Sequence, residues 1–277
     1  MPLSSGILIA VIAFFSEFVD SSLGMGYGTI LTPVLLLMGY SPLEIVPSVL
    51  LSEFATGVVA GFTHHRMGNV DFTPRSTNVV VIARRIRELG YVKSFTHGVP
   101  RHLKIALLLA LCSIVGTIGA VLLAVRLPKN IMVMIIGLII FSMGLVIFFT
   151  RNKEYPFSWK KITGLGLLAS FNKGLSGGGY GPIVTGGQLL AGVETKSTIG
   201  ITSLAEGLTC LTGVIMYWIT VPHVSFTLAP YNVTGALLSV PFAVLAVKKI
   251  NERKLKVVIG VVTLLLGLLT LTKTLSP

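Results

Sequence analysis

The sequence predicts an all-α integral membrane protein built from two inverted repeats of five helical segments each. Three observations predict this class: a hydrophobic fraction of 53% beside only 12% charged residues, long apolar runs, and a repeat of the same residues at a spacing of 153. Soluble domains carry about 25% charged residues, so this composition excludes them. The mean hydropathy of +0.87 points the same way.

Long apolar runs recur along the chain, for example at 103–125 and 131–149. A helix of about 20 residues crosses a bilayer, and these runs lack the alternation of barrel strands, so we expect helices. The first run, 3–15, has no basic leader region and no small-residue cleavage site, so we interpret it as a mature helix. The expected segments are 3–19, 27–40, 43–65, 103–126 and 130–150, then 161–173, 180–192, 196–219, 227–247 and 255–274.

The repeat is clearest where residues 24–28 (GMGYG) fall on residues 177–181 (GGGYG). Over 24–56, 12 of 33 positions are identical to their partners, including Glu53 with Glu206. An odd number of segments in each half turns the second half upside down relative to the first. We therefore expect an N-terminal repeat over 1–150, a linker over 151–161 and an inverted C-terminal repeat over 162–277.

The net charge of +12 reports membrane topology rather than nucleic-acid binding. Of the 22 Lys and Arg residues, 17 lie in the loops 66–104, 151–161 and 248–256. Basic loops stay in the cytoplasm, and only the inverted arrangement puts all three there. We expect a multi-pass protein of the plasma membrane with both termini outside. Within the first loop, 79–90 has the spacing of an amphipathic helix on the cytoplasmic surface, able to anchor the protein or cover the inner gate.

Segments 27–40 and 180–192 are too short to span a bilayer comfortably, and each follows a glycine-rich break. They either span fully or form re-entrant hairpins with the segments before them. Short, glycine-interrupted segments at matching places in inverted halves indicate a transporter's binding site near the midplane. Helices that begin at such breaks offer free N–H groups to an anion, although glycines also allow tight helix packing. The candidate substrate-binding residues are Ser22, Gly24, Gly26, Tyr27, Gly28, Lys173, Ser176, Gly178, Gly179 and Tyr180.

Three acidic residues are candidates for proton coupling: Glu53, Glu206 and Asp20. The two glutamates lie about ten residues into their helices, where a carboxylate must be protonated, paired or functional. The alternative is a protonated glutamate that joins two helices by hydrogen bonds. Asp20 and Lys173 occupy equivalent positions, so Lys173 either binds the substrate anion or pairs with Asp20. Glu17 lies one helical turn from Asp20 and is a weaker candidate for the same cluster.

Other polar residues have structural interpretations. His64 and His65 are adjacent, so on a helix they do not share a face as metal ligands at i and i+4 would, and we expect them at the membrane interface. Cys112 and Cys210 lie in apolar runs and are interpreted as packing residues. Glu44 has the spacing of a capping box. We expect no metal and no cofactor, and without a nucleotide-binding or catalytic motif, no enzyme.

Residues 20–28 (DSSLGMGYG), 32–37 (TPVLLL), 47–53 (PSVLLSE) and 177–182 (GGGYGP) resemble the TauE/SafE sulfite-exporter family of permeases. The resemblance extends over essentially the whole chain. It implies export of sulfite or a small organosulfonate, coupled to protons, across a prokaryotic plasma membrane. Met25 and Tyr27 depart from the commoner GxGGG pattern of the family, so the resemblance does not identify the anion.

The preferred hypothesis is therefore a secondary transporter that exports a small sulfur-containing anion by alternating access. Its expected partners are the anion, protons and the lipid bilayer; a homodimer is a further partner that the sequence allows but does not indicate. Two alternatives stay open: a cation or metal transporter that uses the intramembrane carboxylates, and a non-transporting membrane scaffold or sensor.

Overall fold

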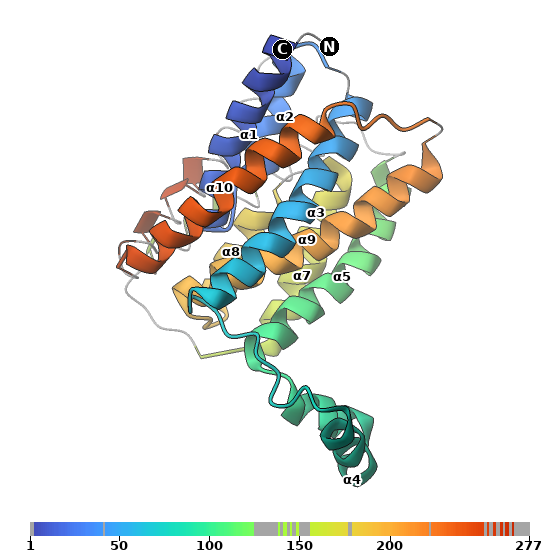
Figure 1. Cartoon of the computed structure of the whole chain (residues 1–277), viewed down its shortest axis with the longest axis vertical. Coiled ribbons are helices and arrows are strands. Elements are labelled where there is room, and N and C mark those ends of the chain that lie inside the picture. Colours follow the sequence, from blue (N-terminus) through green and yellow to red (C-terminus); the bar gives the residue numbers. More distant parts are fainter. Residues whose placement is uncertain are drawn as a thin grey trace.

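The computed structural model is all-helical over the residues it describes, which confirms the predicted fold class (Figure 1). These residues are 3–40, 42–124, 156–176, 179–221 and 223–251, with scattered positions in 138–149 and 254–268. The expected segments 130–150 and 255–274 therefore lie largely outside the described residues. The helices are α1 (Leu3–Leu23), α2 (Tyr27–Leu37), α3 (Pro42–Arg66), α4 (Val79–Gly98), α5 (Arg101–Ala124), α7 (Trp159–Ser176), α8 (Tyr180–Leu190), α9 (Thr195–Thr220) and α10 (Ala229–Lys249).

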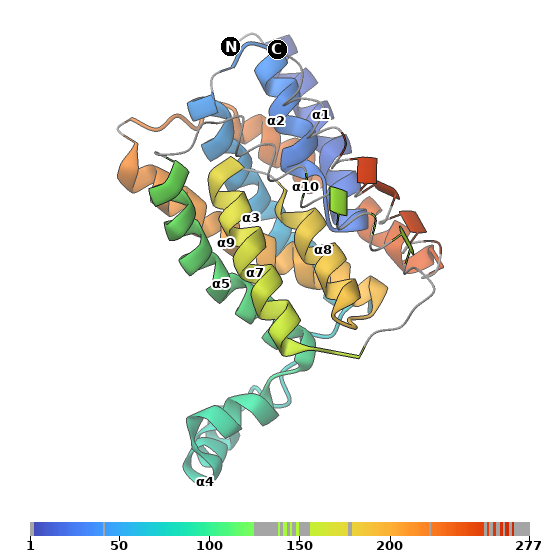
Figure 2. The ribbon, with the colours of Figure 1, turned by 180° about the vertical axis from the view of Figure 1, so that it is seen from behind.

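The short helices α2 and α8 fold back along the helices that precede them. The backbone N–H of Ser158, just before α7, donates to the carbonyl oxygen of Ala191, just after α8, at 3.1 Å. α1 and α2 likewise contact each other and share one apolar cluster, which contains Ile9 and Leu35 (Figure 2). At 11 residues, α2 and α8 are each about 16 Å long and cannot span a bilayer. Each short helix therefore folds back on the helix before it, and the re-entry of these pairs into the membrane remains a prediction.

The long helices α3 and α9 cross at the centre of the molecule (Figure 1). At the crossing Gly57 faces Gly207, and a Cβ on Gly57 would lie 2.6 Å from the carbonyl oxygen of Ser203. Small residues at such a crossing let two backbones approach closely, which is the usual way in which membrane helices pack. Gly57 and Gly207 therefore serve the close packing of α3 against α9.

The remaining helices pack in matching pairs. α1 packs against α10 and α5 packs against α7, while α3 also contacts α10 and α9 also contacts α5. Each pair has a counterpart in the other half of the chain, as related halves would give. The inverted repeat and its boundaries remain predictions.

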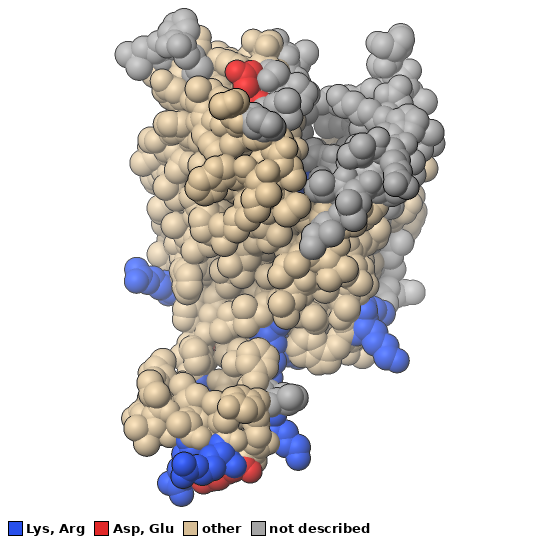
Figure 3. Space-filling view, turned by 90° about the vertical axis from the view of Figure 1, so that its right-hand side faces the viewer, with Lys and Arg blue, Asp and Glu red and all other residues tan. Residues whose placement is uncertain are grey.

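The basic loops gather at one end of the bundle, the end from which α4 extends (Figure 3). A cavity there is lined by Asp71, His102 and Lys196, which come from three different parts of the chain. Lys196 Nζ donates to the carbonyl oxygen of Lys248 at 3.1 Å. The guanidinium of Arg101 lies 4.9 Å from the ring centre of Phe157. The loops that the sequence expects in the cytoplasm are therefore neighbours in space.

α4 projects away from the bundle instead of covering its end (Figure 1). Asn78 caps its N-terminus by accepting from the N–H of Val80, and Gly90, with φ of 76° and ψ of 166°, breaks the helix. Val79 and Val80 are 76% and 75% exposed. The expected amphipathic helix exists, but in this structure its apolar residues are not packed on the bundle.

Among the described residues, four helical stretches are long and apolar enough to cross a membrane: Ser4–Leu23, Glu44–Arg66, Thr195–Thr220 and Ala229–Lys249. Their outer faces carry large apolar side chains, such as Phe15, Trp218 and Phe242, which are 64%, 74% and 61% exposed. Their inner faces carry buried carboxyl and hydroxyl groups. This distribution suits a bundle that is surrounded by lipid and has a polar interior, where functional groups of membrane proteins usually lie.

Candidate functional site

The end of the first helix break contacts the start of α8 inside the bundle. A Cβ on Gly181 would lie 2.5 Å from the carbonyl oxygen of Gly24, and Thr185 Oγ1 donates to that same oxygen at 2.6 Å. Gly24 and Gly26 have φ of +72° and +132°, which L side chains rarely adopt. These glycines therefore form the sharp turn and permit the contact.

The N-terminus of α2 is occupied by a carboxyl group of the chain itself. Asp20 Oδ1 accepts from the backbone N–H of Tyr27 at 3.2 Å. A carboxylate in this position satisfies a free N–H group and interacts favourably with the helix dipole. Asp20 reaches this position because α1 continues to Leu23, four residues beyond its expected end. The anion site expected at this break is therefore filled by Asp20.

The N-terminus of α8 has no such cap. Its N-cap residue is Gly179, with φ of +71°, and the residue equivalent to Asp20 is Lys173, which cannot accept a hydrogen bond. Asn172 Nδ2 donates to the carbonyl oxygen of Gly179 at 3.1 Å, which holds the end of α7 against the start of α8. The two equivalent breaks thus differ in charge: the first carries a carboxylate and the second an ammonium.

Lys173 lies between the two intramembrane glutamates. Its Nζ is 2.6 Å from Glu53 Oε2 and 2.8 Å from Glu206 Oε1. The three side chains are only 3% to 6% exposed. Glu53 Oε1 and Glu206 Oε2 have no hydrogen-bond partner among the described residues. Of the two expected roles for Lys173, pairing with Asp20 is wrong, because the glutamates are its partners in this structure.

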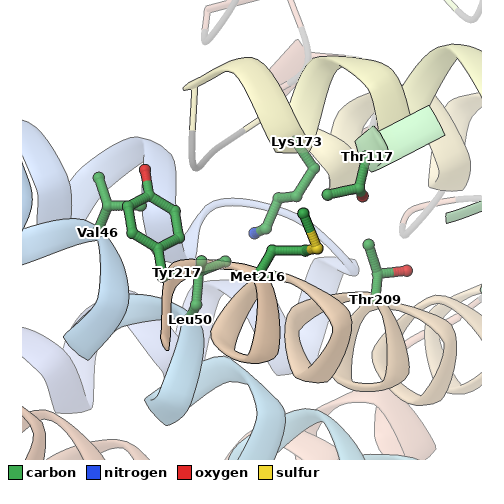
Figure 4. A pocket seen from close by; sticks show the side chains of 8 residues that line it. Val46, Leu50, Thr117, Lys173, Thr209, Met216 and Tyr217 are labelled. Atoms are coloured by element: carbon green, nitrogen blue, oxygen red, sulfur yellow. The ribbon is translucent and has the colours of Figure 1, made fainter. Parts of the chain in front are cut away.

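A small cavity reaches Lys173 from between α3, α5 and α9 (Figure 4). Its volume is about 20 Å³, and Thr117, Met216 and Tyr217 are among its lining residues. That space suffices for a single water molecule but not for a sulfur oxyanion. An anion can reach Lys173 only after the side chains around it move.

Tyr27 and Tyr180 occupy equivalent positions and are both fully buried, but their hydroxyl groups differ. Tyr27 Oη lies 2.7 Å from Ser52 Oγ, a hydrogen bond within the first half. Tyr180 Oη lies beside Thr209, whose own proton is donated to the carbonyl oxygen of Ala205 at 2.8 Å, but no hydrogen bond of good geometry joins Tyr180 Oη to a described residue. A buried hydroxyl without a partner is costly, so it is a natural contact point for a ligand. Of the two tyrosines, Tyr180 is the one with donor capacity to spare.

The buried cluster contains more carboxyl groups than cations. Among the described residues, Glu17, Asp20, Glu53 and Glu206 are buried, and Lys173 is the one buried Lys or Arg. Uncompensated charges are expensive in a low-dielectric interior. The cluster therefore favours bound protons or a bound cation.

The geometry gives no support to a metal centre. No three His, Cys, Asp or Glu side chains in the described part of the chain are grouped so that they could hold a metal ion. Cys210 has a polar role that the sequence interpretation missed, because its Sγ donates to Glu53 Oε2 at 3.4 Å. Both Cys112 and Cys210 are free thiols.

The four remaining expected site residues are Ser22, Gly28, Ser176 and Gly178. Ser22 Oγ donates to the carbonyl oxygen of Val19 within its own helix, at 3.2 Å, so it does not join the cluster. Gly28 is buried in the first turn of α2. Ser176 is described only as the last residue of α7, and Gly178 lies outside the described residues.

Two residues that sequence reasoning left out of the site, Ser21 and His64, lie against it. Ser21 Oγ donates to Glu17 Oε1 at 2.5 Å. His64 is fully buried, with Nε2 at 2.9 Å from the carbonyl oxygen of Ser21, so it faces the interior of the bundle, and its expected place at the membrane interface remains a prediction. A signal was available, since His64 follows Glu53 by 11 residues, or three helical turns, and therefore shares its face.

The model of the sulfite exporter TauE/SafE family matches residues 9–83 and 89–270. The chain belongs to this family. It is also 25% identical, over 277 residues, to the probable membrane transporter protein YtnM of Bacillus subtilis (strain 168), covering 96% of this chain and 82% of that relative. No solved structure gives a significant match. The TauE/SafE family consists of membrane transporters and not enzymes, so the transporter prediction is confirmed.

Proposed function

We propose that this transporter exports a small sulfur-containing anion, sulfite or an organosulfonate, coupled to protons by alternating access. The observation that carries the proposal is Lys173, a buried ammonium held between Glu53 and Glu206; the preceding residue, Asn172, bonds Gly179 at the uncapped N-terminus of α8. A buried ammonium and the free N–H groups of a helix N-terminus are both groups that bind oxyanions. The name of the matched family, sulfite exporter, supports the same class of substrate.

Competition for Lys173 would couple the anion to protons. Its ammonium contacts two carboxylates, so an anion must displace at least one of them. Protonation of Glu53 or Glu206 removes the negative charge that competes with the anion, and thereby releases Lys173. Proton and anion then bind together, because each makes the binding of the other more favourable.

The neighbouring groups have supporting roles in this proposal. Tyr180 Oη would donate to the anion, and Gly179 would let the backbone N–H groups of α8 approach it closely. Asp20 would hold the N-terminus of α2 while it is ionised. Its protonation would weaken the hydrogen bond with the N–H of Tyr27 and loosen the first break, so Asp20 remains a candidate for coupling.

Alternating access would involve the two proposed halves, 1–150 and 162–277. Glu53 lies in the first half, whereas Lys173 and Glu206 lie in the second, so the cluster spans the boundary between them. The gathering of the basic loops at one end of the bundle supports their assignment to the cytoplasm and that of both termini to the outside.

One observation favours a second candidate, a cation transporter that uses the same cluster. The buried carboxyl groups outnumber the buried lysine, as a cation site would require. Saturable cation binding that disappears in Glu53→Gln, without any anion flux, would establish this alternative.

Radiolabelled sulfite uptake into proteoliposomes, with and without an imposed pH gradient, tests the proposal. We expect uptake above that of protein-free vesicles, accelerated by the gradient, and its loss in Lys173→Met. Tyr180→Phe should raise the sulfite concentration for half-maximal uptake several-fold, since one hydrogen bond contributes about 1 kcal/mol. Tyr27→Phe should raise this concentration less, because the hydroxyl group of Tyr27 is already hydrogen-bonded to Ser52.

Lys160→Met is the matched control, since Lys160 is exposed at the start of the same helix. Its uptake should equal that of the wild type. If Lys173→Met carried sulfite as well as Lys160→Met does, Lys173 could not be the anion-binding group. If the wild type carried no sulfite, a panel of organosulfonates would decide whether the substrate class holds.

A further inference from the structure

Glu17 is a buried carboxyl group that the proposed transport cycle does not use. It lies on α1, one helical turn before Asp20, and is 1% exposed. Ser21 Oγ donates to its Oε1, while its Oε2 has no hydrogen-bond partner in the described part of the protein. Thr56 lies beside it, but the single hydroxyl proton of Thr56 goes to the carbonyl oxygen of Ser52 at 3.0 Å.

This environment fits a protonated Glu17 better than an ionised one. An ionised carboxylate would leave one buried oxygen without any donor, which is costly. A proton on Oε2 turns that oxygen into a donor, and the neighbouring Thr56, whose own proton goes to Ser52, supplies an acceptor oxygen. Ser21 continues to donate to Oε1 in either state.

The charged groups around Glu17 act in the same direction. Asp20 on its own helix, Glu53 on α3 and Glu206 on α9 all repel a negative charge there. Lys173, the nearby ammonium, is bound to Glu53 and Glu206. The other titratable groups on the packed helices are Tyr27 on α2, Glu44, His64, His65 and Arg66 on α3, Lys196, Cys210 and Tyr217 on α9, and Tyr231, Lys248 and Lys249 on α10. Of these, Tyr27, His64 and Cys210 are buried, and Tyr27 bonds Ser52 while Cys210 bonds Glu53.

A chain of contacts leads from Glu17 to the basic end of the molecule. His64 Nε2 lies 2.9 Å from the carbonyl oxygen of Ser21, and His64 Nδ1 lies 3.0 Å from Asn69 Nδ2. Because the amide nitrogen of Asn69 can only donate, His64 Nδ1 is the acceptor and Nε2 carries the proton. Asn69 lines the cavity at the basic end, whose volume is about 360 Å³.

His64 closes this route in the structure. The carbonyl oxygen of Ser21 accepts a hydrogen bond but cannot pass a proton on, so the contact between His64 and Ser21 must open before a proton from the cavity reaches Glu17. The cavity side is secured by Asn69, whose Nδ2 also donates to the carbonyl oxygen of Val244 on α10 at 3.3 Å.

We propose that Glu17 is a proton-binding site, separate from the carboxylates that hold Lys173, and that His64 guards its access from the basic end. The proton comes from water in the cavity as hydronium and binds to Glu17 Oε2, and no other bond forms or breaks. The role of this proton in driving export rests on the function proposed above, whereas the existence of the site does not.

Infrared spectroscopy of the full-length protein in liposomes tests the site without any transport. At neutral pH, where exposed carboxyl groups are ionised, the spectrum should still contain the carbonyl band of protonated carboxylic acids, and Glu17→Gln should lose one carboxyl group from that band whereas Glu88→Gln should not change it. Gln keeps an oxygen for Ser21 and an NH₂ group toward Thr56, so folding should be retained. Glu88→Gln is the control, because Glu88 is exposed on α4 and pairs with Arg84. A Glu17→Gln spectrum equal to that of the wild type would overturn the proposal.

A second measurement uses the wild-type protein alone, in case Glu17→Gln fails to fold. Dicyclohexylcarbodiimide, an apolar reagent that modifies protonated carboxyl groups, should modify Glu17 at neutral pH and leave Glu88, which is ionised there, unmodified, as peptide mass mapping would show. Absence of the label from Glu17 would count against the site. In His64→Ala, exchange of the Glu17 proton with deuterium added at the basic end should become several-fold faster, and an unchanged rate would refute the guarding role.

The transport arm separates this inference from the proposed function. In Glu17→Gln, sulfite exchange at equal pH should persist, while acceleration by a pH gradient should fall at least several-fold. Absence of sulfite flux in the wild type, with the Glu17 band intact, would refute sulfite export and leave the proton site standing. An unaltered gradient response in Glu17→Gln would refute its part in coupling.

Discussion

Replacing Lys173 with methionine is the most informative perturbation of this protein's stability. Methionine fills a similar volume but removes a cation whose Nζ lies 2.6 Å from Glu53 Oε2 and 2.8 Å from Glu206 Oε1. It leaves two buried carboxyl groups facing each other without a counter-charge. Because all three groups are almost fully buried, solvent cannot compensate for the loss.

The size of the effect follows from opposing terms. At an effective dielectric constant of about 20, each of the two contacts contributes about 6 kcal/mol of Coulomb attraction. Desolvation of the buried ions offsets several kcal/mol for each ion, so the net loss on removing one partner is about 3–5 kcal/mol. A loss of that size lowers the midpoint of thermal unfolding by roughly 10 °C.

The dependence on pH distinguishes this cause from simple loss of packing. Without Lys173 the two buried carboxyl groups lose their counter-charge, so ionising them costs more in the folded protein than in the unfolded chain. Stability falls as pH rises wherever the native state binds more protons, so the deficit of Lys173→Met should be small in acid and should grow toward alkaline pH. Thermal unfolding in detergent across that range measures it, with Lys160→Met as the control.

A triple variant, Lys173→Met with Glu53→Gln and Glu206→Gln, completes the test. Removing the whole charged group leaves no unpaired charge, and neutral replacement of a buried ion cluster costs little. This variant should therefore recover most of the lost stability. The reasoning would be refuted by a Lys173→Met deficit that is absent, or that is equally large at every pH and in the triple variant.

Two further predictions concern packing and topology. Gly181→Ala should destabilise the fold by about 1–3 kcal/mol, because its Cβ would meet Gly24 and Met25. The control Gly164→Ala has no atom within 4 Å of its Cβ and should not destabilise the fold. Thermal unfolding midpoints measure the difference, and equal midpoints for the two variants would disprove the contact between the breaks. Cysteines introduced at Ser76 and Asn251 should react with a membrane-impermeant thiol reagent only from the cytoplasmic side, whereas labelling from outside would contradict the inverted topology.

The sequence predicts the elements of the site because the repeat marks them twice. Glu53 and Glu206 are equivalent positions on the two long helices, and the structure brings both to Lys173. The glycine breaks are likewise predictable, since Gly24 and Gly26 adopt backbone angles that few other residues can. In both cases the chemistry of a single residue type decides the outcome.

The partners of Lys173 and Asp20 could not be predicted, because they depend on where helices end and how they pack. The expected end of the first segment, at residue 19, puts Asp20 in the break, whereas α1 continues to Leu23. Once the helix is extended, Glu17, Asp20 and Ser21 follow the i, i+3, i+4 spacing and share a face, while Ser22 turns away. A shift of one helical turn in a predicted boundary thus changes which serine belongs to the cluster.

The crossing of α3 and α9 has a mechanical consequence. Gly57 and Gly207 bring the two backbones into direct contact beside the ion cluster, so the helices have no side chains to interlock at that point. Under the alternating access proposed above, this contact would be the point about which the two helices rock. Rocking about a point next to Lys173 would change the spaces at the two ends of the bundle in opposite senses, with little movement at the pivot. A methyl group on Gly57 would push the two backbones apart and so hinder the rocking of α3 against α9.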